Sequence, residues 1–203
     1  MTDSAPYPYG QHRLLDLNLP FLSFERLADQ LQPLPGERML EIGPGTGLQS
    51  LQVAPRLGAE GRLDIVDIQQ EMLDHVMRRA ADSGQDNIVP TLADARELPF
   101  EDATFDAAYL VTALGEIPDF PSALRELRRV LKPTGRLVVG EFFDRHQIRP
   151  ANLARNANAV GLHVVQQSGP ALAYYALLRP CTSGSDGRPN AGTADLCAAT
   201  IDC

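Results

Sequence analysis

The chain has 203 residues, of which 26 are acidic, 18 are basic and 44% are hydrophobic, and its net charge is −8. This length and composition predict one globular domain rather than a disordered chain. The negative charge argues against nucleic acid or an anionic lipid surface as a partner, because both would be repelled. The N-terminus lacks the basic and apolar regions of a secretion signal, and no apolar run is long enough for a spanning helix. We therefore expect no secretion signal and no membrane span.

Short apolar runs alternate with longer amphipathic runs along most of the chain. A helix is expected over residues 21–31, and amphipathic helices are expected after the second and fourth of the strands that follow it. The predicted strands cover residues 38–43, 62–68, 87–93, 105–112 and 135–142. A helix over residues 150–160 then leads into strands over residues 161–167 and 171–178, which are joined as a hairpin. The prediction is an α/β fold, a doubly wound, mostly parallel seven-stranded sheet with helices on both faces and one antiparallel strand.

The composition divides the chain into three parts. Residues 1–35 are expected to form an N-terminal helical or lid segment, residues 36–180 the main domain, and residues 181–203 a flexible tail. The tail is rich in small and polar residues and buries too little apolar surface to offset the entropy of ordering it. It also holds all three cysteines, Cys181, Cys197 and Cys203. Their odd number argues against a disulfide framework and favours a reducing, cytoplasmic location, and the lack of a Cys-x-x-Cys pair argues against a zinc site.

A glycine-rich loop, residues 41–47 with the sequence EIGPGTG, follows the first predicted strand and is expected to run directly into a helix. Glycines let the backbone turn tightly and lie against a ligand, and a helix N-terminus offers unpaired N–H groups. A dinucleotide-binding loop needs the pattern G-x-G-x-x-G, but Leu48 stands at the position of its third glycine. An NAD-dependent oxidoreductase is therefore the weaker alternative, and a loop that serves only packing also stays open.

Together with the residues that follow it, this loop resembles the first motif of the class I S-adenosylmethionine-dependent methyltransferases. The resemblance is closest to the small-molecule branch that includes the ubiquinone and menaquinone C-methyltransferases. It covers roughly residues 36–142, with the motifs in the family's order. It implies a Rossmann-like methyltransferase fold, S-adenosyl-L-methionine as cofactor and a small-molecule methyl acceptor. The few residues outside these motifs leave little room for a domain that recognises a macromolecule.

The resemblance implies where the cofactor binds. The first motif, with Glu41, Gly43, Gly45 and Gly47, would approach the methionine part of the cofactor through its backbone.

Further motifs would hold the nucleoside part. Asp67 would accept the ribose hydroxyls, and Ile68 begins the segment that is expected beside the adenine. Asp94 would accept the adenine amino group, while the backbone N–H of Ala95 meets the ring. Val111, at the end of the fourth predicted strand, belongs to the segment expected to offer a backbone carbonyl to the cofactor's amino group.

No residue is identified as catalytic from the sequence. Methyl transfer is an in-line displacement, so the protein must position the acceptor and exclude water, and it needs a base only for a protonated acceptor. Glu116 is a candidate base, with a solvated loop carboxylate as the alternative. His12 in the N-terminal segment is the other candidate, as part of a lid. We expect no second carboxylate to cluster with Asp144 near the end of the fifth predicted strand, so we assign no metal. A cofactor-binding protein without methyl transfer stays as the alternative function, and the oligomeric state is not predicted.

Overall fold

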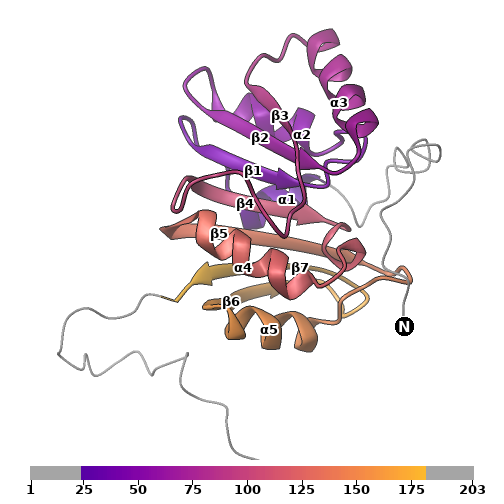
Figure 1. The fold of residues 1–203 in the computed structure, drawn as a ribbon, viewed down its shortest axis with the longest axis vertical. Helices are drawn as coiled ribbons and strands as arrows, with labels where there is room; N and C mark the ends of the chain where they lie inside the picture. Colours follow the sequence, from indigo (N-terminus) through magenta and orange to yellow (C-terminus); the bar gives the residue numbers. More distant parts are fainter. Residues whose placement is uncertain (1–23, 182–203) are drawn as a thin grey trace, which may run out of the picture.

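The computed structural model describes residues 24–181 (Figure 1). The strands are β1 Arg38–Ile42, β2 Arg62–Asp67, β3 Ile88–Leu92, β4 Phe105–Val111, β5 Leu131–Phe142, β6 Leu162–Ser168 and β7 Ala173–Pro180. They form one seven-stranded sheet in the order β3-β2-β1-β4-β5-β7-β6. Neighbouring strands are parallel except at β7, which is antiparallel to β5 and to β6. The predicted fold class, with its single antiparallel strand, is confirmed.

Helices cover both faces of the sheet (Figure 1). On one face lie α1 Phe24–Leu31, α2 Ser50–Val53, the 3-10 helix η3 Ala54–Leu57 and α3 Gln70–Asp82. On the other face lie α4 Phe120–Val130 and α5 Pro150–Ala159, and the 3-10 helix η4 Leu114–Glu116 leads into α4. Successive strand residues point to opposite faces, so Met39 and Leu40 of β1 join different core clusters. The central strands are apolar on both faces for this reason.

The structure differs from the sequence prediction most at the helix after β1 and at the start of β5, and the other described boundaries agree within two residues. The helix expected directly after residue 47 begins only at Ser50, and α2 is four residues long. Pro55 lacks an N–H for the α-helical ladder, and the chain continues there as η3. The fifth strand begins at Leu131 instead of residue 135. Phe105 pairs with Leu131 but Ala107 pairs with Arg136, so the strand bulges between these pairs and its regular part matches the prediction.

Some predictions fall on residues that the structure does not describe. The N-terminal lid, including His12, lies outside the described residues apart from α1 and the segment after it. Most of the predicted tail, with Cys197 and Cys203, lies outside them as well. Within residues 24–181, no helix combines the length and the apolar character that crossing a membrane requires.

Candidate functional site

A cavity of about 400 Å³ opens at the carboxyl edge of the sheet. Its walls come from the loops that follow β1, β2, β3, β4 and β5. The connections after β1 and β2 run over one face of the sheet, and those after β4 and β5 run over the other. Parallel sheets of this kind leave a crevice where the direction of winding changes, here between β1 and β4. The cavity therefore lies where an α/β sheet binds its ligands.

The glycine-rich loop forms the wall after β1. Gly43, Gly45 and Gly47 all have positive φ angles, of 66°, 54° and 81°, which favour glycine at each position. A Cβ atom on Gly43 would lie 2.7 Å from Cβ of Ala113, and one on Gly47 would lie 3.0 Å from Cγ1 of Val76. Gly43 and Gly45 line the cavity, whereas Gly47 is not among the lining residues. Gly47 thus allows the loop to pack closely against α3, which is the role expected of a loop that serves only packing. Gly43 also permits close packing, but it lies in the cavity wall as well.

Substitution of Gly43 by alanine is expected to destabilise the fold by about 1–2 kcal/mol more than substitution of Gly84, a difference measurable by urea denaturation. The two positions have nearly equal φ angles, 66° and 65°, so both alanine variants carry similar backbone strain. A Cβ on Gly84 meets nothing within 4 Å, whereas a Cβ on Gly43 meets Ala113. Equal losses in the two variants would contradict the tight contact between the two loops.

Glu41 is a buried carboxyl group at the end of β1, with 3% of its surface exposed. Its Oε2 accepts hydrogen bonds from Oγ of Ser50 at 2.5 Å and from the hydroxyl of Tyr109 at 2.9 Å. Burial, assisted by the charge of Asp67, raises the pKa of Glu41 to about 7, although the hydrogen bonds from Ser50 and Tyr109 oppose this shift. Glu41 also lines the cavity, so a cationic ligand there would favour its ionised form.

Asp67 and Ile68 form the wall after β2. The backbone N–H of Gln69 donates to Oδ1 of Asp67 at 2.9 Å, which fixes the carboxylate at the cavity. Burial raises the pKa of Asp67, although backbone hydrogen bonds oppose this shift. Ile68 is 53% exposed and lines the same cavity. A carboxylate beside an apolar surface suits a ligand with hydroxyl groups next to a flat ring.

The wall after β3 carries Asp94, Ala95 and Arg96. The backbone N–H of Arg96 donates to Oδ1 of Asp94 at 2.8 Å, and its guanidinium pairs with the same carboxylate. Hydrogen bonds from the Arg96 side chain lower the pKa of Asp94. Val111, at the end of β4, completes the set of predicted residues at the cavity. The structure therefore brings together every predicted cofactor residue except Gly47.

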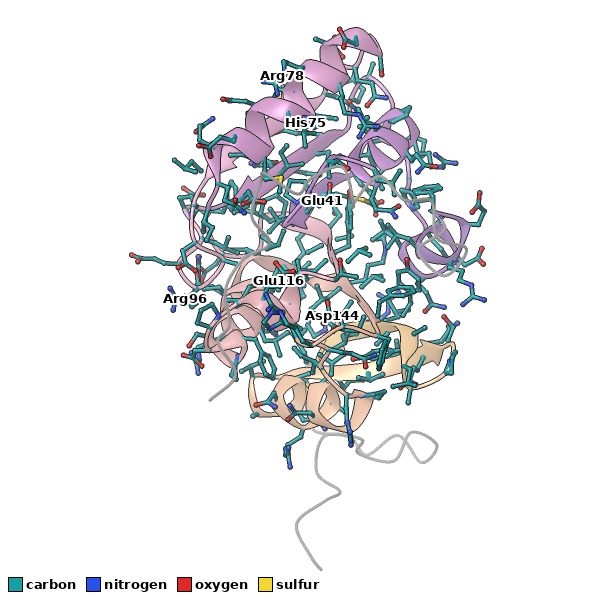
Figure 2. All side chains as sticks on the ribbon, turned by 90° about the vertical axis from the view of Figure 1, so that its right-hand side faces the viewer. Glu41, His75, Arg78, Arg96, Glu116 and Asp144 are labelled. Atoms are coloured by element: carbon teal, nitrogen blue, oxygen red, sulfur yellow. The ribbon has the colours of Figure 1, made fainter. Side chains whose placement is uncertain are left out.

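Carboxylates gather at the side of the cavity formed by the loops after β4 and β5. Glu116 and Asp144 both line it, and Figure 2 shows them on the same side of Glu41. Behind them lies Glu141, only 2% exposed, whose Oε2 accepts the N–H of Ile148 at 2.9 Å. Burial raises the pKa of Glu141 to about 8, and the charges of Asp144 and Glu116 add to this effect. This side can accept a proton from a ligand.

Sequence reasoning missed two buried polar groups at this site. Glu141 stands out in the sequence only as an acidic residue inside an apolar strand. Thr46, in the glycine-rich loop, is 2% exposed, and its hydroxyl is one of the buried side-chain atoms without a hydrogen-bond partner among the described residues. It lines the cavity. A buried hydroxyl without a partner is costly, and a polar ligand in the cavity would satisfy it.

No group of three His, Cys, Asp or Glu side chains within residues 24–181 is arranged to hold a metal ion. The donors at the cavity instead fit an organic ligand. The carboxylate of Asp67 fits a diol, the exposed Ile68 fits a flat ring, and Glu41 together with the partnerless hydroxyl of Thr46 fits a charged polar end. A nucleoside joined to an amino acid has all of these groups.

The doubly wound sheet, the cavity at its switch point and this donor set define a Rossmann-like protein of the S-adenosylmethionine-dependent methyltransferase class. Residues 19–173 match the ubiE/COQ5 methyltransferase family, and the chain belongs to this family. The predicted family and fold are thus confirmed, and S-adenosylmethionine is the cofactor that membership implies.

Individual proteins agree with this assignment. The ubiquinone/menaquinone biosynthesis C-methyltransferase UbiE of Cellvibrio japonicus is 42% identical over 112 residues, which are 55% of this chain and 45% of that protein. The chain spans about half the length of the curated relatives it matches. A methyltransferase structure from Aquifex aeolicus has a TM-score of 0.75 at 18% identity, covering 85% of this chain and 98% of that one. The [4+2]-cyclase SpnF has a TM-score of 0.68 at 20% identity, covering 90% and 85%, so the fold alone does not define the reaction.

Proposed function

We propose that this chain transfers the methyl group of S-adenosylmethionine to a carbon atom of a small aromatic acceptor of the quinol type. The observation that carries the proposal is the cavity at the carboxyl edge of the sheet, in which a nucleoside-binding side faces a side with carboxylates. The names of the relatives, which are C-methyltransferases of quinone biosynthesis, support the choice of acceptor. No observation favours the alternative of a cofactor-binding protein without methyl transfer.

Each part of the cofactor has residues that would hold it. Asp67 would accept the ribose hydroxyls, Ile68 would pack on the adenine, and Asp94 with Ala95 would meet its amino group and ring edge. The loop with Gly43 and Gly45, the hydroxyl of Thr46 and the carboxyl of Glu41 would surround the methionine part, and the backbone at Val111 borders it.

When bound, S-adenosylmethionine supplies a methyl group activated by a positively charged sulfur. The chain has to hold the acceptor carbon in line with that methyl group and exclude water. A quinol also has to lose a proton for its ring carbon to attack, and Glu116 and Asp144 are the carboxylates at the cavity that can accept it. Glu141, which accepts N–H donors from Gly115 and Ile148, holds the loops that carry these two residues against each other.

The proposal is tested by incubating the full chain with S-adenosylmethionine and 1,4-naphthohydroquinone without oxygen. Mass spectrometry is expected to detect S-adenosylhomocysteine together with a naphthohydroquinone that carries one added methyl group on carbon. The Asp67→Ala variant serves as the control with impaired cofactor binding. If the chain binds S-adenosylmethionine but forms no S-adenosylhomocysteine with any of a panel of quinols, phenols and amines, methyl transfer is the wrong function.

Two further predictions from the sequence belong to this proposal. The net charge of −8 supports a small-molecule acceptor over nucleic acid, because a polyanion would be repelled. The cytoplasmic location stays a prediction.

A further inference from the structure

Thr112, which follows β4 at the cavity, has a backbone conformation that threonine rarely adopts. Its φ angle is 57°, in the left-handed region, where a β-branched side chain is strained. Gln32, Ala103 and Asp119 are the other non-glycine residues with a positive φ in the part of the chain that the structure describes. Of these four, Thr112 alone is β-branched and Thr112 alone lines the cavity. Strained residues of this kind gather at functional sites, which makes Thr112 a candidate functional residue.

The contacts around Thr112 hold its backbone in this conformation. Its N–H donates to the carbonyl oxygen of Gly140 in β5 at 2.8 Å. The next residue, Ala113, packs so tightly on the glycine-rich loop that a Cβ on Gly43 would lie 2.7 Å from the Cβ of Ala113. Neither contact involves the side chain of Thr112. Since glycine adopts a positive φ without strain, the backbone conformation alone does not account for a threonine at this position.

The hydroxyl of Thr112 is already engaged as a donor. Its Oγ1 donates to the carbonyl oxygen of Val111 at 2.7 Å. A hydroxyl has one hydrogen and two lone pairs, so this bond leaves Oγ1 with acceptor sites only, while the carbonyl oxygen keeps a second lone pair. Val111 and Thr112 both line the cavity. They therefore offer two neighbouring acceptors to a ligand, and their side chains offer it no donor.

These acceptors lie beside the strand that carries Glu41. In the parallel pair of β1 and β4, Glu41 is in register with Tyr109, two residues before Val111. The carboxyl group of Glu41 lines the same cavity. A ligand group with several N–H donors, a positive charge and no acceptor matches such a set, and an ammonium group has these properties.

We propose that Thr112 binds the positively charged amino group of the cofactor's methionine part, which would donate to Oγ1 of Thr112 and to the carbonyl oxygen of Val111. This inference rests on the proposed function, because it assumes S-adenosylmethionine in the cavity. It gives the side chain of Thr112 a contact with the cofactor, in addition to the backbone carbonyl expected at the end of β4. The left-handed turn then serves to place the hydroxyl at the cavity wall.

Calorimetric titration with two ligands tests this contact. S-adenosylhomocysteine carries the amino group, whereas 5′-methylthioadenosine has the same nucleoside and a sulfur atom but no amino acid end. The Thr112→Val variant keeps the branched shape and removes the hydroxyl. It is expected to bind S-adenosylhomocysteine about 10-fold more weakly than the wild type, which corresponds to the loss of one hydrogen bond from a charged donor. Its affinity for 5′-methylthioadenosine is expected to be unchanged. The Thr112→Ser variant keeps a hydroxyl and is expected to bind both ligands like the wild type.

The Thr112→Gly variant separates the hydroxyl from the backbone strain. Glycine adopts this φ without strain, so the melting temperature is not expected to fall, yet the affinity for S-adenosylhomocysteine is expected to fall about 10-fold. The matched control is Ala103→Gly, which relieves a positive φ of 52° in an exposed turn that does not line the cavity. This control is expected to bind both ligands like the wild type.

The outcomes separate the contact from the proposed function. Equal affinities of the wild type and Thr112→Val for S-adenosylhomocysteine would overturn the contact. An equal loss of affinity for both ligands would also overturn it, because Thr112 would then shape the cavity rather than bind the amino group. A wild-type chain that binds neither ligand would instead overturn the proposed function. Melting temperatures verify that each variant is folded, and Thr112→Gly decides the question if Thr112→Val does not fold.

Discussion

Replacement of Asp67 by alanine is expected to weaken the binding of S-adenosylhomocysteine by roughly 10- to 100-fold in equilibrium dialysis. The carboxylate at the end of β2 lines the cavity and is held by the N–H of Gln69. Hydrogen bonds from ligand hydroxyls to a charged acceptor contribute about 1.5–3 kcal/mol, which corresponds to that range. The raised pKa of Asp67 shows that its ionised form is disfavoured by burial, so the fold gains little from the charge itself.

Two variants separate the ligand contact from other effects of this change. Asp67→Asn keeps an acceptor for the N–H of Gln69 but loses the charge, and it is expected to bind with intermediate affinity. Asp74→Ala removes an exposed carboxylate from α3 that accepts the side-chain amide of Gln70 at 2.8 Å and does not line the cavity, and it is expected to bind like the wild type. Affinities that are equal in wild type and Asp67→Ala would contradict the position of the ribose at β2.

Replacement of Glu41 by glutamine is expected to remove a pH dependence of stability of roughly 3 kcal/mol. The ordinary pKa of this carboxyl is 4.5, and burial raises it to about 7 in the folded chain. Below pH 4.5 both states are protonated and the group contributes nothing. Between pH 4.5 and 7 the unfolded chain releases the proton while the folded chain retains it, so stability falls as the pH rises. Above pH 7 both states are ionised and the loss is constant.

The measurement is the free energy of unfolding in urea at pH 5, 6, 7 and 8 for both proteins. Glutamine keeps an oxygen that can accept Ser50 and Tyr109, but it does not titrate. The difference in stability between variant and wild type should therefore shift by about 3 kcal/mol in favour of the variant between pH 5 and pH 8. Glu141 has a pKa of about 8 and shifts stability in the same direction, but it is present in both proteins and cancels in the difference. If the free energies of unfolding of the two proteins changed with pH in parallel, the raised pKa of the buried Glu41 carboxyl would be contradicted.

The order of strands and helices could be predicted because each buried parallel strand is a short apolar run and each helix has one apolar stripe. The boundaries that differ depend on contacts that are distant in sequence. The start of β5 at Leu131 depends on pairing with Phe105, which the sequence pattern around Pro133 does not reveal. The short α2 is the exception, because Pro55 was a local signal for its end.

The residues on the nucleoside side of the site could be predicted because they follow directly after strands. Each of them belongs to a short motif that can be recognised in the sequence. The opposite side could not, because it forms where two loops meet. Glu141 becomes buried only when Gly115 packs against the loop that contains His146, where a Cβ on the glycine would lie 2.0 Å from the His146 carbonyl oxygen. Neither loop carries a local signal for that contact. Asp94 and Arg96 both lie within the predicted motif, but their ion pair depends on side-chain geometry that the motif does not determine.

A crystal structure of the chain with S-adenosylhomocysteine tests the central claim most directly. The ligand is expected at the carboxyl edge of the sheet, with its ribose hydroxyls within hydrogen-bond distance of Asp67, its adenine against Ile68 and its sulfur facing the side with Glu116 and Asp144. A nucleoside bound with its ribose away from Asp67, or a ligand bound outside this cavity, would contradict the assignment of the site.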